Sequence, residues 1–185
     1  MIAPIIPVAE GFAPIVGDGA RVLILGSLPG RRSLLEQQYY AHPQNSFWRI
    51  MAKIMDNDAG CPYQIRCRRL IKYRFALWDV LAASSRPGSL DSAIDMGSAR
   101  ANDFDSFLGQ FPEIELICFN GKKARELFDH LVLKSVPAAA KCKLLTLPST
   151  SPAYAAISFE DKLHRWWLIG GHRVSSPGDP QAHAS

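Results

Sequence analysis

The residues best suited to chemistry lie in one stretch, Gly26 to Trp48, which reads GSLPGRRSLLEQQYYAHPQNSFW. It contains two tyrosines, Tyr39 and Tyr40, followed closely by the imidazole of His42 and the amide of Asn45. Aromatic rings held over a cleft can stack on a nucleic acid base, and polar side chains beside them can hydrogen-bond to it. The stretch therefore predicts a site that binds a base.

This stretch begins as a tight turn. Gly26 and Gly30 allow sharp bends of the backbone, and Pro29 stiffens the turn between them. The loop that starts with this turn runs for about twenty residues before the next helical pattern, and a loop of that length is usually functional or disordered. The aromatic residues argue against disorder, so we expect an ordered functional loop.

Four short apolar segments predict the strands that position this loop and others. The predicted strands are Arg21–Leu25, Phe75–Trp78, Glu115–Phe119 and Lys143–Leu147. The loops that follow them begin at Gly26, Asp79, Asn120 and Pro148, and the second of these loops includes Ser84–Gly88. The apolar runs are largely unbroken, as expected for parallel strands that are covered on both faces.

Helical patterns fall between the strands. The predicted helices span 47–54, Tyr63–Tyr73, Asn102–Gln110, 124–131 and Phe159–Ile169, with Ser158 as the N-cap of the last. This alternation predicts a three-layer α/β/α domain with a central, mostly parallel four-stranded sheet. Ligands bind such sheets beyond the carboxyl ends of the strands, so the four loops should converge on one site.

Composition narrows the function classes. The chain has 185 residues, with 21 Lys and Arg against 17 Asp and Glu, a net charge of +4 that is compatible with a polyanionic partner. Its four cysteines are scattered without a C-x-x-C pair, so we expect neither a metal site nor a cofactor, and instead free thiols in a reducing compartment.

The organisation predicts one domain, residues 1–174, followed by a disordered tail rich in Pro, Ser and Ala, residues 175–185. The N-terminus lacks the basic start of a signal peptide, and no apolar run approaches the roughly 20 residues that span a bilayer. We therefore expect a cytoplasmic monomer that does not bind membranes.

Several motifs in the functional stretch carry a family resemblance. Gly26–Gly30 reads G-S-x-P-G, Gln38–Tyr40 reads Q-Y-Y, and His42–Trp48 reads H-P-x-N-x-F-W. Together they resemble the first motif of the uracil-DNA glycosylase superfamily, and are most similar to its sixth family, the hypoxanthine-DNA glycosylases. Four further blocks resemble the family in the same order: Leu77–Val80, Arg86–Asp91, Phe119–Gly121 and Pro148–Ala153.

The resemblance, which covers about residues 21 to 167, implies a uracil-DNA glycosylase-like fold. It also implies a monofunctional DNA glycosylase of base excision repair. Such an enzyme flips a deaminated base out of single- or double-stranded DNA and hydrolyses its N-glycosidic bond.

One position departs from the superfamily pattern. Most members carry an Asp or Asn in the turn after the first strand, where it handles the hydrolytic water, whereas this turn offers only Ser27. The resemblance to the hypoxanthine branch implies that Asn45 takes this role, with its side-chain carbonyl oxygen positioning the water. It also implies weak or absent uracil activity and favours hypoxanthine, from deoxyinosine, as the base. The alternative for Asn45 is a helix cap.

Further residues are expected around the base. Either Tyr39 or Tyr40 stacks on it while the other packs into the core, and we favour Tyr40 for stacking. His42 either donates to the departing base or a phosphate, or bonds to the backbone. The turn residues expected to line this base pocket are Gly26, Ser27, Leu28 and Pro29.

Two strand ends face the same pocket. Trp78 and Asp79 end the second strand, and Asp79 either accepts a hydrogen bond from the ring N–H that hypoxanthine and uracil share, or serves as an N-cap or ion-pair partner. Asn120 ends the third strand and either bonds to the base edge or braces the pocket, although Asn-Gly is also a common turn dipeptide.

The loop Pro148–Ala153 resembles the family segment that presses into the duplex. Its residues Ser149, Thr150, Ser151 and Pro152 offer small hydroxyls and backbone N–H groups that suit phosphate oxygens. Arg31 and Arg32, beside the functional loop, are candidates for phosphate contacts. Tyr154 is either a wedge in the duplex or a core residue.

Two other functions remain open. One is a uracil- or thymine-mismatch-specific DNA glycosylase with the same fold, and the other is a DNA- or nucleotide-binding α/β module without catalysis. A Rossmann dehydrogenase is disfavoured because Gly26–Gly30 is not G-x-G-x-x-G and no ribose-binding acid follows at the expected spacing. No lysine is clearly placed to form a Schiff base, so lyase activity is not predicted.

Overall fold

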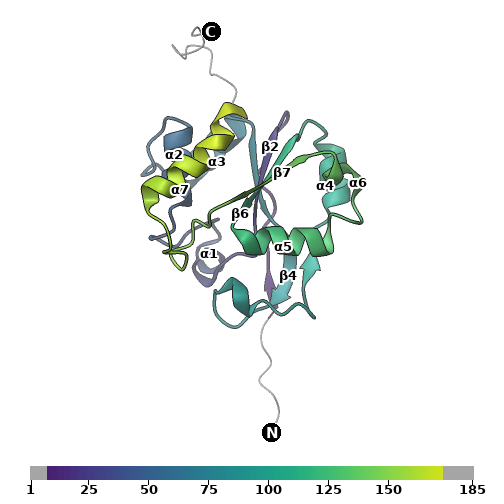
Figure 1. The fold of residues 1–185 in the computed structure, drawn as a ribbon. Coiled ribbons are helices and arrows are strands. Elements are labelled where there is room, and N and C mark those ends of the chain that lie inside the picture. The colour runs from purple at the N-terminus through teal and green to yellow at the C-terminus, as the bar shows by residue number, and fades with distance from the viewer. Residues whose placement is uncertain (1–7, 173–185) are drawn as a thin grey trace.

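A computed structural model describes residues 8–172, and four parallel strands form its central sheet in the order β3-β2-β6-β7 (Figure 1). The strands are β2 (Val22–Gly26), β3 (Phe75–Asp79), β6 (Leu116–Asn120) and β7 (Lys143–Leu147). They agree to within a residue with the four predicted strands, and the predicted four-stranded parallel sheet is confirmed. The predicted tail, 175–185, lies outside the described residues.

Helices cover both faces of this sheet. On one face lie α2 (Phe47–Ile54), α3 (Tyr63–Lys72) and α7 (Phe159–Trp166), which continues into the 3-10 helix η2 (Trp167–His172). On the other face lie α4 (Phe104–Gln110), α5 (Lys122–Leu131) and α6 (Pro137–Ala140). Because helices lie on both faces of the sheet, the three-layer prediction is confirmed. The predicted N-cap is also confirmed, because Ser158 Oγ accepts a hydrogen bond from Asp161 N at 3.0 Å.

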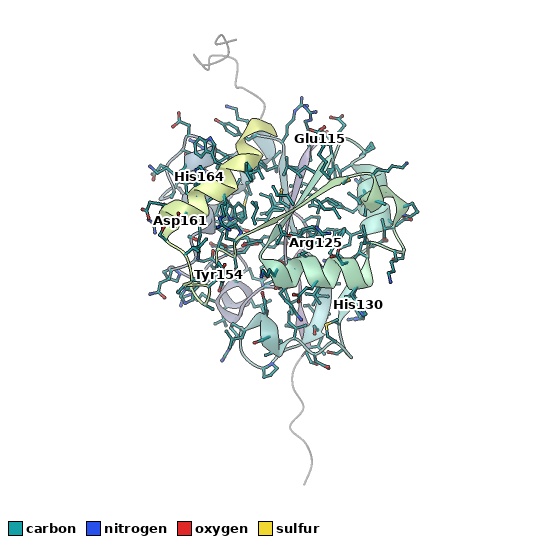
Figure 2. The ribbon with its side chains drawn as sticks, in the orientation of Figure 1. Glu115, Arg125, His130, Tyr154, Asp161 and His164 are labelled. Atoms are coloured by element: carbon teal, nitrogen blue, oxygen red, sulfur yellow. The ribbon has the colours of Figure 1, made fainter. Side chains whose placement is uncertain are left out.

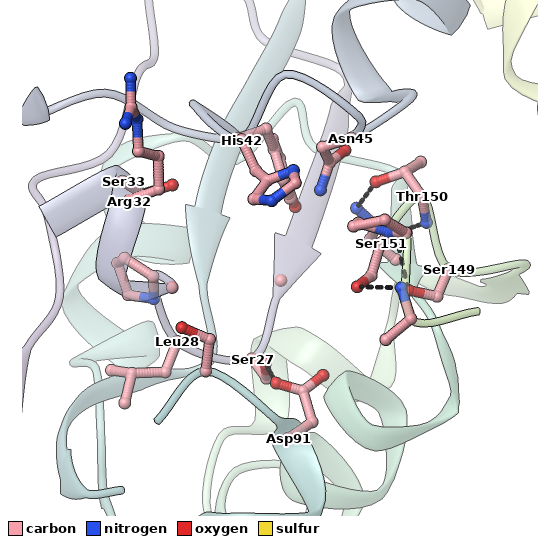
Figure 3. A pocket seen from close by; sticks show the side chains of 18 of the residues that line it. Ser27, Leu28, Arg32, Ser33, His42, Asn45, Asp91, Ser149, Thr150 and Ser151 are labelled. Atoms are coloured by element: carbon pink, nitrogen blue, oxygen red, sulfur yellow. Dashed lines mark hydrogen bonds between the residues drawn. The ribbon is translucent and has the colours of Figure 1, made fainter. Parts of the chain in front are cut away.

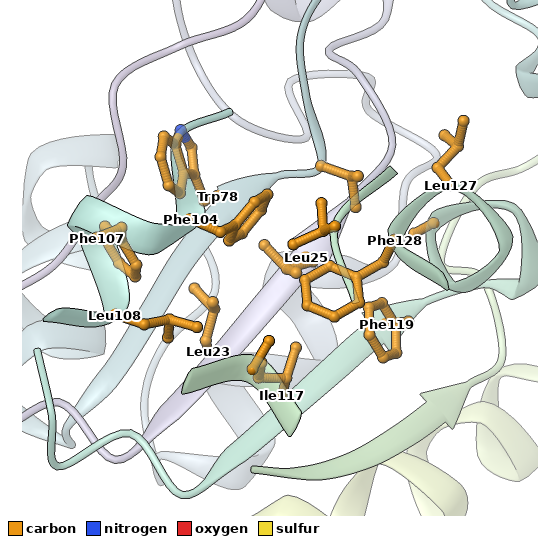
Figure 4. Packing of buried hydrophobic residues seen from close by; sticks show 14 of the residues in the cluster. Leu23, Leu25, Trp78, Phe104, Phe107, Leu108, Ile117, Phe119, Leu127 and Phe128 are labelled. Atoms are coloured by element: carbon orange, nitrogen blue, oxygen red, sulfur yellow. The ribbon is translucent and has the colours of Figure 1, made fainter. Parts of the chain in front are cut away.

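The strands join the layers because their alternate side chains enter opposite cores. Leu23 and Leu25 of β2 point into the core beneath α4 and α5, where Phe128 packs against Phe104 and Phe119 (Figure 4). The intervening Val22 and Ile24 lie in the core beneath α2, α3 and α7. Each strand thus requires apolar residues at every position, which explains the unbroken runs in the sequence.

A second, smaller sheet was not predicted. Three antiparallel strands form it in the order β1-β4-β5: β1 (Val8–Glu10), β4 (Leu81–Ser85) and β5 (Arg100–Ala101). The prediction that Ser84 and Ser85 belong to a loop is wrong. The segment LAASS offers no alternation of apolar and polar residues, and it becomes a strand because segments distant in sequence supply its backbone partners.

The predicted long loop after β2 is also interrupted, by the short helix α1 (Arg31–Glu36). The helix ends at Glu36, and the C-cap residue Gln37 adopts a left-handed conformation (φ 52°). No amphipathic pattern marks this helix, because α1 packs little apolar surface and its Leu35 is 81% exposed. A further 3-10 turn, η1 (Asp91–Ala93), follows β4. Among the described residues, no helix has the length and apolar character needed to cross a membrane.

The aromatic core predicts a large effect of Phe128→Ala. This side chain is fully buried between Phe104 and Phe119, so truncation should lower the free energy of unfolding by about 3–5 kcal/mol. Chemical denaturation would measure the change. Leu35→Ala, at an exposed site, is the matched control and should change stability by less than about 0.5 kcal/mol.

Candidate active site

The parallel register places the ends of the strands side by side. Gly26 pairs with Asp79 across β2 and β3, and Asn120 pairs with Leu147 across β6 and β7. The loops that follow these residues therefore start from one edge of the sheet, and they enclose a pocket of about 440 Å³. This is within the usual range for a small-molecule site.

Most residues predicted for the site line this pocket (Figure 3). From the base-pocket prediction these are Gly26, Ser27, Leu28, Pro29, Tyr39, Tyr40, His42, Asp79 and Asn120, together with Asn45. From the DNA-binding prediction they are Arg31, Arg32, Ser149, Thr150, Ser151 and Pro152. Segments from four strand ends thus meet at one place, as the loop positions predicted.

Trp78 is the exception, and its placement in the base pocket is wrong. Its indole packs against Phe104 and Phe107 in the core under α4, at ring-centroid distances of 5.2 and 4.8 Å, and its Nε1 donates to Phe12 O at 3.0 Å. Successive side chains of a strand point to opposite faces, so Trp78 and its neighbour Asp79 cannot both face the pocket.

The two tyrosines have different environments. Tyr39 is only 3% exposed, meets Phe12 edge-on and donates its hydroxyl hydrogen bond to Ala13 O at 3.2 Å, so it is the core member of the pair. Tyr40 packs one ring face on Phe47, with centroids 4.1 Å apart, and adopts a positive φ of 54°. Its buried hydroxyl makes no hydrogen bond. Burial, followed by the negative charge of Asp79, raises the pKa of Tyr40, while Asn120 acts in the opposite direction.

Asp79 forms the floor of the pocket. Its carboxylate is almost completely buried, and Oδ2 has no hydrogen-bond partner. Burial, followed by the negative charge of Asp91, raises the pKa of Asp79 to about 7, while Arg86 acts in the opposite direction. The paired position must be glycine, since a Cβ on Gly26 would lie 2.4 Å from Asp79 Oδ1 and 3.0 Å from the Tyr40 hydroxyl.

Asn45 lies at the edge of the pocket just before α2. Its Oδ1 accepts a hydrogen bond from Phe47 N at 3.0 Å, so it does serve the start of the helix. The amide nitrogen is left to face the pocket (Figure 3). The prediction that the carbonyl oxygen holds the water does not match this arrangement; the group that Asn45 presents is a donor.

His42 lies beside Asn45 on the same rim (Figure 3). Its Nδ1 accepts a hydrogen bond from Gln44 N at 3.2 Å, which leaves Nε2 to carry the proton of a neutral ring. Both predicted roles are therefore compatible, since one nitrogen bonds to the backbone and the other can donate. Among residues 8–172, no group of three His, Cys, Asp or Glu side chains is arranged to hold a metal ion.

Thr150 joins three loops at the back of the pocket. Asn120 donates from Nδ2 to Thr150 Oγ1 and accepts from Thr150 N, both at 2.8 Å. The carbonyl of Thr150 in turn accepts hydrogen bonds from the backbone N and the hydroxyl of Ser46. Asn120 therefore braces the pocket, one of its two predicted roles, and holds the Ser149–Pro152 loop against the residue that follows Asn45.

The segment Arg86–Asp91 holds the turn after β2 in place. No role was predicted for this segment from the sequence. Arg86 is buried and donates to the carbonyl oxygens of Leu28 and Pro29. Ser89 Oγ accepts from Arg31 N at 3.0 Å, and Asp91 accepts from the Ser27 hydroxyl at 2.6 Å. The family-like motif in this segment was a usable signal, but nothing in it reveals which loop it contacts.

The mouth of the pocket carries charged and aromatic groups. Arg31 and Arg32 line it at the start of α1, and Arg32 also pairs with Glu36. Tyr154 lies on the loop between β7 and α7 and is 38% exposed, so it is not a core residue (Figure 2). Lys162 holds this tyrosine by donating to its carbonyl oxygen at 2.6 Å, with the ammonium 5.3 Å from the ring centroid.

This architecture matches a known family. The sequence model described as the Uracil DNA glycosylase superfamily matches residues 14–167. The chain belongs to this superfamily. Its members are DNA glycosylases, which hydrolyse the N-glycosidic bond between a base and its sugar, and the protein is therefore a DNA glycosylase.

Individual relatives of this glycosylase agree with the assignment. A Methanosarcina acetivorans protein named hypoxanthine DNA glycosylase is 42% identical over 166 residues, which cover 89% of this chain and 99% of the relative. A Methanosarcina barkeri protein of the same name is 39% identical over 118 residues, covering 63% and 73%. The solution NMR structure of a candidate uracil DNA glycosylase from M. acetivorans superposes with a TM-score of 0.76 at 34% identity, covering 90% and 98%.

The buried carboxylate predicts how the stability of the glycosylase depends on pH. The folded state raises the pKa of Asp79 from 3.8 to about 7, so it binds the proton more tightly than the unfolded chain does. Stability should therefore fall as pH rises from about 4 to about 7, where the folded protein must bury the ionised form. The cost is on the order of 4 kcal/mol above that range.

Asp79→Asn should remove this dependence and be more stable than the natural chain at pH 8, as measured by urea denaturation at several pH values. Asp105→Asn, at an exposed carboxylate of α4, is the control and should follow the natural chain. A pH profile that Asp79→Asn leaves unchanged would contradict the burial argument.

Proposed function

We propose that this glycosylase removes hypoxanthine from deoxyinosine in DNA. The observation that carries the proposal is that Asp79 and Tyr40, each with a buried side-chain oxygen that has no hydrogen-bond partner, lie beside Gly26 in the lining of a single pocket. The names of the two Methanosarcina relatives support the same substrate.

The two groups suit the edge of a deaminated base. Hypoxanthine presents a ring N–H beside a carbonyl oxygen, and the ionised Asp79 can accept from the first while the Tyr40 hydroxyl donates to the second. Adenine, the parent base, presents a ring acceptor beside an amino group. The ionised Asp79 would then face an acceptor, and the donating Tyr40 hydroxyl would face a donor. Buried polar groups that are left unpaired penalise the wrong base strongly.

Uracil shares the N–H and carbonyl edge, so Asp79 and Tyr40 can bond to it in the same way as to hypoxanthine. Uracil is therefore the second candidate substrate, and a damaged-base panel decides between them. Duplexes with deoxyinosine, deoxyuridine or a G·T mismatch should show excision of hypoxanthine first. Stronger release of uracil or thymine would reassign the substrate, and DNA binding without release of any base would indicate a binding module.

The mouth of the pocket suits the DNA strand. The hydroxyls and N–H groups of Ser149–Pro152, braced through Thr150, can bond to phosphate oxygens on one side, and Arg31 and Arg32 can approach phosphates on the other. Tyr154, held by Lys162, is placed to fill the gap that a flipped nucleotide leaves. These contacts favour any DNA backbone, and the pocket selects the damage.

For the reaction, Asn45 is placed to hold the hydrolytic water. Its Nδ2 faces the pocket and can donate to the water oxygen, while the bond to Phe47 N fixes the orientation of the amide. As the base departs with its bonding electrons, the sugar gains oxocarbenium character and the water is already in place to attack it.

Asn45→Ala should fold normally and lose about 10²–10³-fold in the single-turnover rate on deoxyinosine DNA, because the water loses its anchor. The assay is quantification of abasic sites after alkaline cleavage. Asn57→Ala, which changes an asparagine outside the pocket, is the matched control and should keep full activity. A rate within twofold of the natural enzyme would remove Asn45 from the mechanism.

Tyr40→Phe deletes one hydroxyl and should lower kcat/KM for deoxyinosine by about 5- to 10-fold, the value of one hydrogen bond to the base. The packing of the ring on Phe47 is retained, so the melting temperature should stay the same. Tyr73→Phe, outside the pocket, controls for loss of a tyrosine hydroxyl. If Tyr40→Phe has full activity, the hydroxyl does not contact the base.

A further inference from the structure

The turn after β2 contains no acidic residue of its own, but the fold brings one to it. Asp91, 64 positions along the chain, begins η1 and accepts a hydrogen bond at 2.6 Å from Ser27 Oγ to its Oδ1 (Figure 3). Both residues line the pocket. A carboxylate therefore lies at this turn although the local sequence supplies only a serine.

The environment of Asp91 fixes its orientation. Arg86 Nη1 lies 3.7 Å from the same Oδ1, and this guanidinium also holds the carbonyl oxygens of Leu28 and Pro29. The second oxygen, Oδ2, has no hydrogen-bond partner among the described residues. Asp91 is thus held by one oxygen and free to accept a proton or a hydrogen bond with the other.

The two acids of the pocket differ in depth. Asp79 is 3% exposed and lies at the floor, whereas the side chain of Asp91 is 43% exposed. A flipped nucleotide enters with its base deepest and its sugar nearer the mouth. This difference in depth favours Asp79 for contact with the base and Asp91 for contact nearer the sugar.

We propose that Asp91 is a second catalytic residue of this glycosylase, which accepts the proton of the hydrolytic water, and that Ser27 is its positioning residue. The inference rests on the proposed function as a hydrolase of deoxyinosine. Asp91 supplies the proton acceptor that Asn45 lacks, because the amide of Asn45 can donate to the water oxygen but is too weak a base to accept a proton.

The bond between the base nitrogen and C1′ breaks, and both electrons leave with the base. The water oxygen forms a bond to C1′, and one water proton passes to Asp91 Oδ2. The departing base takes up a proton from solvent, and Asp91 returns its proton to solvent. Before that transfer, the negative charge of Asp91 also stabilises the oxocarbenium-like sugar.

The test uses the full chain and a duplex with one deoxyinosine. Asp91→Asn should lower the single-turnover rate by about 10²-fold or more, because a neutral amide cannot accept the water proton. Ser27→Ala should lower it about tenfold, through loss of one hydrogen bond to the carboxylate. Affinity for a duplex with non-cleavable 2′-fluorodeoxyinosine should change less than threefold in both variants. Asp95→Asn, an exposed acid in the same segment and outside the pocket, is the control.

Chemical rescue separates catalysis from a structural role. Asp91→Ala opens space for a small carboxylate, so added sodium formate should raise the rate of this variant at least tenfold. Sodium chloride at the same ionic strength should leave the rate unchanged. A structural role for Asp91 would show no formate rescue and a lowered melting temperature.

The outcomes distinguish the two proposals. If the natural enzyme does not release hypoxanthine, the proposed function fails. If it does, and Asp91→Asn retains more than a third of the rate or formate has no effect on Asp91→Ala, the role of Asp91 is overturned while the function stands.

Discussion

The parallel register of β2, β3 and β6 is the constraint on which this site depends. Because parallel strands end at the same edge, Gly26, Asp79 and Asn120 come together although they are scattered over almost a hundred residues of sequence. The register also determines residue types. Asp79 can occupy the floor only because its cross-strand neighbour is a glycine, whose missing side chain leaves room for the carboxylate and for the Tyr40 hydroxyl.

Hydrogen bonds between loops complete what the register begins. Thr150 bonds to Asn120 at the end of β6 and to Ser46 at the start of α2, and Arg86 holds the carbonyl groups of the turn after β2. The loops that surround the pocket are thereby braced before DNA arrives. An enzyme that stabilises charge with fixed groups does not reorganise them during the reaction, which is the main source of electrostatic catalysis.

The pocket combines two acids in different environments. Burial raises the pKa of Asp79 to about 7, and the negative charge of Asp91 adds to that effect, so the two carboxylates influence each other. Asp91 is more exposed and is held by a hydroxyl and a guanidinium. Two acids placed at different depths can perform different tasks, one at the base and one at the sugar.

The sequence by itself determined the four strands, the helices with clear apolar stripes and the position of the pocket, because burial on both faces demands unbroken apolar runs and parallel strands end together. It also identified Asn45, Asp79 and Tyr40 as pocket residues. Only the tertiary structure decided that β4 is a strand, that Trp78 faces the core and that Asn45 presents its nitrogen. It alone brought Arg86 and Asp91 to the turn at Ser27. These outcomes depend on partners distant in sequence, which no local pattern of residue types encodes.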